Sequence, residues 1–503
     1  MIIAQFIIIS LQAASSEIIW EDKFMIGREK EIEQLKRLYE KDKAELVAVY
    51  GRHRVGKTFL VDEVFKGRIT FHHSGLSPVE MAEHAGVRPL KQQLQAFYYS
   101  LLYHGMQRTH CPKDWLEAFY MLEVFLRDRD DGSRQLVFLD ELPWMDTKKS
   151  GFITGFESFW NGWACHRHNI MVIVCGSATS WIQDKLINNH GGLYNRVTYQ
   201  MKLEPFSLNE CDAFLKECGI EMSQYDVAQS YMIVGGVPYY LGYFSRGKSL
   251  PQIVDDLFFN RNAHLASEYD RLFSSVFSEP AIMKEIVEFL SRRSAGYSRK
   301  EIIRNTSAKD GGPLSEKLSA LIASDFIIKY VPFGKSEEYY KLTDPFCLFY
   351  LRFVKDKGSL NEQFWQQNSS SPAILSWRGY SFENLCFNHI RQIKRTLGIL
   401  GVSTKESAWN KHDGEDEGTQ INLIIERKDN VVNMCEIKFY GNEFTVDKQY
   451  DLVLRNRVSA LSKLIGPKCT IQNTLISTFG VKANQYAWAF DNVITLRDLF
   501  MPL

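Results

Sequence analysis

The sequence has no excess of charge of either sign, because 60 basic and 60 acidic side chains cancel among its 503 residues. A chain without net charge generates no overall field that would draw it to nucleic acid or to an anionic membrane surface. Any contact with DNA therefore has to come from a local basic patch. The chain is also too long for one ordinary core, so we expect between two and four domains of roughly 100–200 residues each.

Cysteine pairs and long apolar runs are absent as well. The nine cysteines are scattered and contain no C-x-x-C pair, which argues against a disulfide or zinc framework. It predicts reduced thiols in a cytoplasmic protein, nearly all of them acting as small buried hydrophobes. The apolar run from Phe6 to Leu11 is too short to span a bilayer, and no Lys or Arg precedes it. We therefore expect no membrane partner, and we interpret residues 1–24 as an extension outside the core.

One short segment carries a phosphate-binding pattern, G-x-x-x-x-G-K-[ST], between an apolar run and a helical pattern. The residues are Gly51, Arg52, His53, Arg54, Val55, Gly56, Lys57 and Thr58. In this spacing the glycines let backbone N–H groups curl around phosphate, Lys57 reaches the β- and γ-phosphates, and the Thr58 hydroxyl binds Mg²⁺. The pattern predicts a nucleotide site. Arg52, His53 and Arg54 add positive charge beside the phosphates, or they face solvent.

A matching acidic segment follows in the stretch RQLVFLDELPWM. Its apolar residues 136–139 predict a buried parallel strand that ends at Asp140 and Glu141. Asp140 would hold Mg²⁺ through water, and Glu141 would polarise the attacking water. A solvated strand end is the alternative interpretation, but the upstream loop makes it the weaker one.

Two further polar positions are candidates for the same site. Ser177 and Thr179 follow the next apolar run, where a polar sensor would stand beside the γ-phosphate. Arg196 follows the pair Gly191 and Gly192. It would contact nucleotide charge in cis or from a neighbouring subunit. Surface solvation is an equally good interpretation of this arginine.

The order of the stretches FMIGREKEIEQL, the phosphate loop, LVFLDE, VIVCGSATSWI, GGLYNRV, LEPFS and VGGVPYYL resembles the archaeal-type ATPase family, a branch of the AAA+/STAND-like P-loop NTPases. The resemblance implies an α/β P-loop core over residues 25–205, a helical lid over 206–275, and ATP with Mg²⁺ as cofactors. It also implies that Gly27 and Arg28 lie near the adenine. Gly235, Gly236 and Pro238 would belong to the lid, and they are equally typical of a turn that ends a helix.

Residues 276–350 predict three amphipathic helices and a terminal β-hairpin, a winged-helix pattern. Its basic residues, between positions 292 and 304, are compatible with DNA phosphate contacts. They are Arg292, Arg293, Arg299, Lys300 and Arg304. The third helix has no Asn, Gln or Arg to read base edges, so packing within or between subunits is as good an interpretation as DNA binding.

Residues 360–503 resemble the restriction-endonuclease-like PD-(D/E)XK fold that this ATPase family carries at its C-terminus, in a segment labelled DUF234. One long helix from Trp377, a strand pair and a further helix carry the resemblance. By that resemblance Glu383 is an outer acidic residue, while Glu436 and Lys438 supply Glu-x-Lys. Asn422 stands where the metal-binding aspartate belongs. An amide brings no negative charge to Mg²⁺, so we expect a degenerate nuclease.

The acidic run Asp413, Glu415, Asp416 and Glu417 could replace the missing aspartate, although such a run is typical of a solvated loop. Three hypotheses for function follow. The leading one is an ATPase that acts as a nucleotide-driven switch on its C-terminal domains, with DNA and a second copy of the chain as candidate partners. The alternatives are a DNA nuclease regulated by ATP, and a signalling or scaffold protein that binds nucleotide with little turnover.

Overall fold

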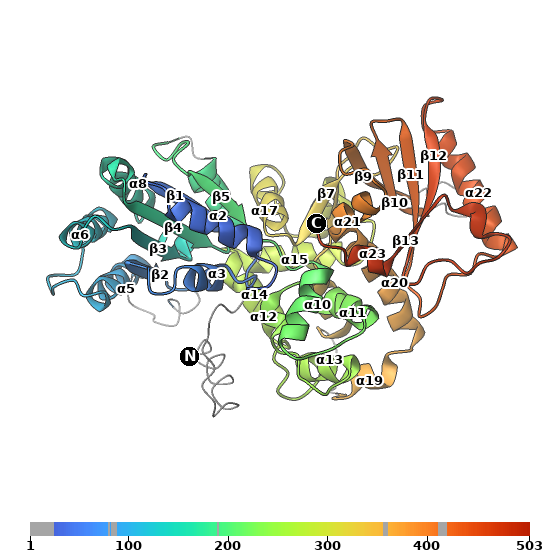
Figure 1. The fold of residues 1–503 in the computed structure, drawn as a ribbon, viewed down its shortest axis with the longest axis horizontal. Helices are drawn as coiled ribbons and strands as arrows, with labels where there is room; N and C mark the ends of the chain where they lie inside the picture. Colours follow the sequence, from blue (N-terminus) through green and yellow to red (C-terminus); the bar gives the residue numbers. More distant parts are fainter. Residues whose placement is uncertain (1–24, 79–80, 82–87, 189–190, 356–360, 411–419) are drawn as a thin grey trace.

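The computed structural model describes residues 25–78, 81, 88–188, 191–355, 361–410 and 420–503. It consists of two α/β lobes, each built on a five-stranded sheet, with a helical region between and below them (Figure 1). The N-terminal extension predicted over 1–24 and the acidic run at 413–417 lie outside the described residues. Among the described residues, no helix combines the length and the hydropathy needed to cross a membrane.

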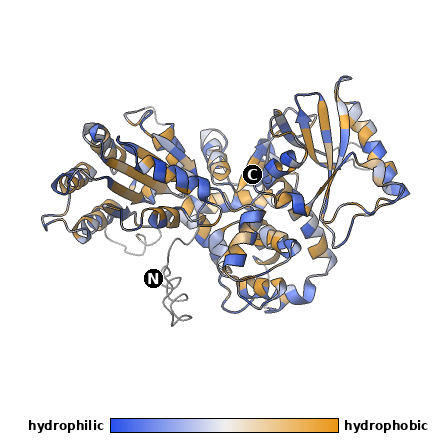
Figure 2. Cartoon of the chain, in the orientation of Figure 1, coloured by the Kyte–Doolittle hydropathy of each residue, from blue (hydrophilic) through white to orange (hydrophobic). Residues whose placement is uncertain are grey.

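The first lobe holds a parallel sheet in the order β2-β3-β4-β1-β5. Its strands are β1 (Glu45–Tyr50), β2 (Phe71–Ser74), β3 (Gln135–Asp140), β4 (Ile170–Gly176) and β5 (Tyr199–Lys202). Its helices are α2 (Glu29–Tyr39), α3 (Lys57–Val64), α5 (Pro89–Tyr103), α6 (Trp115–Asp128), α7 (Leu142–Met145), α8 (Phe152–Gly162) and α9 (Thr179–Ile182), with short turns at η1 (Ala164–His166) and η2 (Gln183–Ile187). The three central strands, β3, β4 and β1, are hydrophobic along most of their length (Figure 2).

Both faces of this sheet are buried, as the apolar runs predicted. Along β1, Leu46 and Ala48 pack into one core and Val47 and Val49 into another. Alternate side chains of a strand point to opposite faces, so a sheet covered by helices on both faces requires continuous apolar strands. The predicted strand ending at Asp140 is therefore confirmed as β3.

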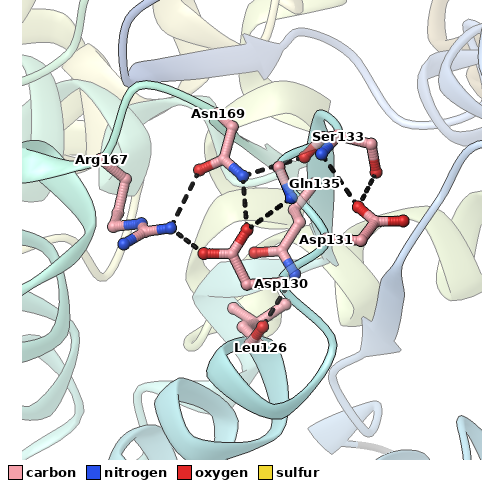
Figure 3. A network of polar contacts seen from close by, with 8 residues as sticks. Leu126, Asp130, Asp131, Ser133, Gln135, Arg167 and Asn169 are labelled. Atoms are coloured by element: carbon pink, nitrogen blue, oxygen red, sulfur yellow. Dashed lines mark hydrogen bonds and ion pairs between the residues drawn. The ribbon is translucent and has the colours of Figure 1, made fainter.

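A polar network at the amino end of β3 fixes the loop that enters the sheet (Figure 3). Asn169 Nδ2 donates to Asp130 Oδ1 at 2.8 Å and to the Ser133 carbonyl at 2.9 Å, and Arg167 pairs with Asp130. The N–H of Gln135, the first residue of β3, donates to the Asn169 carbonyl at 2.7 Å. The starts of β3 and β4 are thus tied together, which aligns their carboxyl ends at the opposite edge of the sheet.

The helical region contains α10 (Leu208–Glu217), α11 (Gln224–Val234), α12 (Pro238–Leu241), α13 (Leu250–Phe258) and α14 (Glu268–Val276). Ser207 begins α10 with a capping box to Glu210, a local sequence signal for a helix start. Gly235 ends α11 at φ 68° and Pro238 opens α12, so the helix-terminating interpretation of these residues is correct. A Cβ on Gly236 would lie 1.8 Å from the Phe206 carbonyl oxygen, so only glycine fits there.

The segment after the lid forms three helices and a three-stranded antiparallel sheet in the order β6-β8-β7. The elements are α15 (Pro280–Leu290), β6 (Tyr297–Ser298), α16 (Arg299–Asn305), α17 (Gly312–Ala323), β7 (Ile327–Tyr330) and β8 (Tyr339–Leu342), followed by α18 (Pro345–Phe353). The third helix, α17, packs against α9 of the first lobe. This contact favours the packing interpretation of the segment, and its winged-helix identity stays a prediction.

The second lobe contains a mixed sheet in the order β13-β12-β11-β10-β9. Its strands are β9 (Thr404–Asn410), β10 (Gln420–Arg427), β11 (Val431–Lys438), β12 (Thr470–Ser477) and β13 (Asn492–Thr495). Its helices are α19 (Phe364–Asn368), α20 (Pro372–Asn388), α21 (Ile390–Thr396), α22 (Lys448–Ser462) and α23 (Leu496–Leu499), with a short turn at η3 (Ala487–Ala489). The prediction of a single helix from Trp377 is wrong, because the helix is interrupted at His389, between α20 and α21. The His389 Nε2 accepts the Leu208 N–H at 3.0 Å.

One hydrophobic core runs from the lid through the middle segment to the second lobe. It is a continuous cluster that extends from Phe206 to Phe500 and includes Phe326 and Phe349. The boundaries predicted near residues 275 and 350 therefore separate sequence patterns within a shared core. All nine cysteines lie among the described residues and none of them forms a disulfide, but only five are buried, fewer than the sequence led us to expect.

Candidate nucleotide site

The phosphate loop lies at the carboxyl edge of the parallel sheet, between β1 and α3. Its backbone takes left-handed or otherwise positive φ angles at Gly51 (142°), Arg54 (70°) and Gly56 (91°). A Cβ on Gly51 would lie 2.3 Å from the Leu203 carbonyl oxygen, so the position requires glycine. Gly56 is the N-cap of α3, which therefore presents its positive N-terminus to the loop. This backbone fits a bound phosphate chain.

Lys57 and Ser177 meet inside this loop. Lys57 Nζ donates to the carbonyls of Gly51 (3.1 Å) and Arg52 (2.9 Å) and to Ser177 Oγ (3.1 Å). Ser177 follows β4, the neighbour of β1, so the two residues come from adjacent carboxyl ends. The lysine is only 5% exposed. The lysine ammonium thus lies inside the loop and donates to neutral oxygens. Phosphate oxygens can replace these acceptors.

Thr58 and Asp140 supply the oxygen atoms expected of a magnesium site. Thr58 Oγ1 donates to Asp140 Oδ2 at 2.8 Å. A hydroxyl and a carboxylate side by side form the hard oxygen set that Mg²⁺ takes when phosphate completes its coordination. The residues therefore fit the ion that the sequence pattern implied.

Glu141 stands at the start of α7 in a left-handed conformation, with φ 45°. Its carboxylate accepts hydrogen bonds from the Ser177 N–H at 3.0 Å and from Ser177 Oγ at 2.5 Å. Burial raises the pKa of Glu141, against the opposing charge of Lys57, and the charge of Asp140 raises it further. A carboxylate whose pKa is raised is a stronger base, which suits general-base work.

His53 also faces the centre of the site, with Nδ1 at 3.1 Å from Ser177 Oγ. Burial and the neighbouring charges of Lys57, Arg54 and Arg52 lower its pKa well below the usual range. The imidazole is therefore neutral at physiological pH and adds no charge beside the phosphates.

The interpretation that Arg52 and Arg54 face solvent is wrong. Arg52 is 2% exposed and pairs with Asp344. Arg54 pairs with Glu268 at 2.9 Å and lies over the Tyr239 ring at 4.1 Å. Sequence reasoning missed these partners, and the one signal available was the presence of two arginines inside the loop.

Three other predicted residues lie away from these groups. Arg28 Nη2 donates to the Glu204 carbonyl at 2.7 Å and its guanidinium lies over the Phe206 ring, so it joins the start of α2 to the chain after β5. Gly27, at φ 67°, is too close to Glu210 to carry a side chain. Arg196 is exposed. The adenine and arginine roles of these residues stay predictions.

Known proteins match both the site and its lobe. Residues 25–244 match an ATPase domain predominantly from Archaea. The match spans the loop, the acidic strand end, Ser177 and the helices α10 to α12, and it supports an ATP-binding ATPase function for this part of the chain. The chain is also 24% identical to an uncharacterized protein of Methanocaldococcus jannaschii over an alignment of 455 residues. The alignment covers 88% of this chain and 92% of that protein.

Two solved structures have lower sequence identity to this chain. A Walker-type ATPase of Pyrococcus abyssi covers 65% of this chain and 96% of its own, at 18% identity and a TM-score of 0.43. The ORC2 protein of Aeropyrum pernix, in ADPNP and ADP complexes, covers 71% of this chain and 98% of its own, at 12% identity and a TM-score of 0.39. At these scores, the two likenesses carry no conclusion over to this chain.

The four residues of the candidate nuclease site do gather in the second lobe. Asn422 Nδ2 on β10 donates to Glu383 Oε1 on α20 at 2.5 Å. On β11, Lys438 Nζ pairs with Glu436 Oε1 at 2.8 Å. Sequence reasoning missed Arg457 and Tyr450, which both contact the Glu436 carboxylate. No group of three or more His, Cys, Asp or Glu residues that could hold a metal ion occurs in the described part of the chain.

The predicted basic patch is partly neutralised. Arg293 pairs with Glu301 at 3.0 Å, and Arg299 pairs with Asp310 at 2.9 Å. The Arg292 guanidinium lies 5.9 Å from the Phe289 ring centroid. Two of its arginines thus already have carboxylate partners, which weakens the case for DNA phosphate binding at residues 292–304.

Proposed function

We propose that the chain binds Mg-ATP at the loop of residues 51–58, hydrolyses it, and uses the nucleotide state as a switch on its C-terminal half. One observation carries this proposal. Lys57, Glu141 and Ser177 form a single hydrogen-bonded set beside the Thr58 and Asp140 oxygens.

Each side chain has a defined task in this proposal. Lys57 holds the β- and γ-phosphates and balances the charge that develops on the transferred group. Thr58 and Asp140 would hold Mg²⁺, which neutralises phosphate charge. Glu141 accepts the proton of the attacking water once its carboxylate turns from Ser177 to that water. Ser177 would then donate its hydroxyl to the γ-phosphate.

Arg196 would supply positive charge from a neighbouring copy of the chain. Its exposure supports contact across an interface, which makes a homo-oligomer one proposed partner.

Two variants test the proposal in the full chain. Lys57→Ala should abolish binding of a fluorescent ATP analogue, whereas Lys66→Ala, an exposed lysine beyond α3, should not. Glu141→Gln should keep the binding and lower steady-state hydrolysis by a factor of about 10²–10⁴, the usual contribution of a general base. Hydrolysis is measured with and without DNA. Wild-type turnover no higher than that of Glu141→Gln would instead favour a signalling or scaffold protein.

The nuclease alternative is disfavoured by the occupation of Glu436. Arg457, Lys438 and Tyr450 already engage its carboxylate oxygens, so a metal ion would have to displace an ion pair. Asn422 supplies no compensating charge. We therefore expect no Mg²⁺-dependent DNA cleavage.

A further inference from the structure

Both arginines of the phosphate loop form ion pairs with carboxylates from distant parts of the chain. Arg52 pairs with Asp344, and the two residues are 2% and 1% exposed. Asp344 is also the N-cap of α18, where its Oδ1 accepts the Cys347 N–H at 2.7 Å. The Arg52 guanidinium lies 5.3 Å from the Phe326 ring centroid. Its Nε and Nη2 atoms are buried without a hydrogen-bond partner among the described residues, so Asp344 is its main charge compensation.

Arg54 is held by an ion pair of its own. Its guanidinium pairs with Glu268 at 2.9 Å and lies 4.1 Å from the Tyr239 ring centroid. Glu268, at the start of α14, is 1% exposed and also accepts the Tyr240 hydroxyl at 2.9 Å. Tyr239 belongs to α12 and Glu268 to α14, and both helices lie in the helical region (Figure 1). The arginines of the loop therefore contact residues of α12 and α14 and the N-cap of α18.

These contacts fix a backbone that would otherwise relax. Arg54 has φ 70°, a left-handed conformation that a residue with a side chain keeps only when its surroundings hold it. The ion pair and the ring contact do so, and they thereby set the direction of the N–H groups between Gly51 and Lys57. A bound phosphate chain depends on those N–H groups.

We infer that Asp344 and Glu268 are positioning residues of the nucleotide site, acting through Arg52 and Arg54, so that the site is complete only when the C-terminal half is docked. The inference rests on the proposed ATP binding. It implies that docking of the C-terminal half regulates that binding. Separation of the two halves would withdraw both carboxylates, release the loop and weaken nucleotide binding. A bound nucleotide would in turn favour the docked arrangement, because coupling between sites is reciprocal.

The test uses substitutions that keep the local hydrogen bonds. Glu268→Gln removes the charge but retains an acceptor for Tyr240, and Asp344→Asn retains an N-cap oxygen. Each should raise KM for ATP about tenfold, the scale of one charged hydrogen bond, with kcat changed less than about twofold. In the double variant Arg54→Gln with Glu268→Gln, KM for ATP should be less than about threefold higher than in the Arg54→Gln single variant. The reason is that the two side chains act as a unit.

A second ion pair at the same junction serves as a control. It distinguishes an effect on the position of the loop arginines from a general weakening of the docked arrangement. Lys202 on β5 pairs with Asp325 at 2.6 Å, across the contact between the first lobe and the middle segment but outside the loop. Lys202→Gln breaks this pair but keeps the Asp325 charge, which acts on Arg52, so KM should stay within about twofold of wild type. An equal rise in KM in this control, additive effects in the Arg54 and Glu268 cycle, or an unchanged KM in Glu268→Gln would each overturn the inference. Failure of the wild type to bind ATP would instead overturn the proposed function.

If Asp344→Asn does not fold, the less buried Arg54 and Glu268 pair decides alone. Limited proteolysis provides a second measurement: ATP should protect the junction between residues 200 and 210 in wild type and should protect it less in Glu268→Gln. Equal protection in the two proteins would contradict the reciprocal coupling.

Discussion

Glu383 offers a test of whether the second lobe holds a working metal site. Its carboxyl group lies between α20 and β10, accepts a hydrogen bond from Asn422 at 2.5 Å, and has the buried Lys341 of β8 as a neighbouring charge. Burial raises the pKa of Glu383 to about 7; Lys341 opposes the shift and Glu436 adds to it. At neutral pH a substantial fraction of this group is therefore protonated. The perturbation is Glu383→Gln, which mimics the neutral acid.

The expected magnitude follows from linkage between protonation and folding. A folded-state pKa of about 7 lies above the unfolded value of about 4.5, so the folded chain binds the proton more tightly. The stability that this proton provides is fully present below pH 4.5 and is lost as the pH rises through 7. Between pH 5 and pH 8 wild type should lose about 2.5 kcal/mol that Glu383→Gln does not lose.

The assay compares thermal unfolding of wild type and Glu383→Gln at pH 5 and pH 8. The variant should gain several degrees in Tm relative to wild type on going to pH 8, while pH effects common to both proteins cancel. A difference in Tm that is the same at both pH values would refute the reasoning. If Mg²⁺ abolishes the pH effect in wild type, the ion binds the ionised carboxylate, and the degenerate interpretation of this site is wrong.

Two other predictions concern the first lobe and the lid. Gly236→Ala should destabilise the chain by more than about 2 kcal/mol in thermal unfolding, because the new Cβ would lie 1.8 Å from the Phe206 carbonyl oxygen; Gly162→Ala, with open space around its Cβ position, should not. Arg196→Ala should leave ATP affinity unchanged and lower hydrolysis only at protein concentrations where copies associate; a loss of hydrolysis that does not depend on concentration would refute an action in trans.

The part of the nucleotide site that comes from strand ends could be predicted from the sequence. Apolar runs located β1, β3 and β4, and the carboxyl ends of neighbouring parallel strands meet at one edge of a sheet. Lys57, Asp140 and Ser177 were therefore expected to lie together, and they do. Motif spacing sufficed there because each residue stands within a few positions of its strand.

The partners of Arg52 and Arg54 could not be predicted in this way. Asp344 caps a helix almost 300 positions further along the chain, and its approach to the loop depends on how the middle segment docks against the first lobe. The break at His389 is similar, because an imidazole that accepts the distant Leu208 N–H leaves no trace in local periodicity. Strand β9 was missed because the acidic run after it obscured its pairing with β10.

The same long-range contacts explain why Glu436 and Lys438 can persist without nuclease chemistry. Glu436 is 3% exposed, and its carboxylate is balanced by Lys438 and Arg457. Removing one partner from a buried ion pair leaves an uncompensated charge and costs about 3–5 kcal/mol. Once the pair is built into the junction of β11 and α22, folding alone is sufficient to retain it. The Glu-x-Lys pattern in this lobe therefore does not require nuclease chemistry, and we expect the chemistry of the chain at the loop around Lys57.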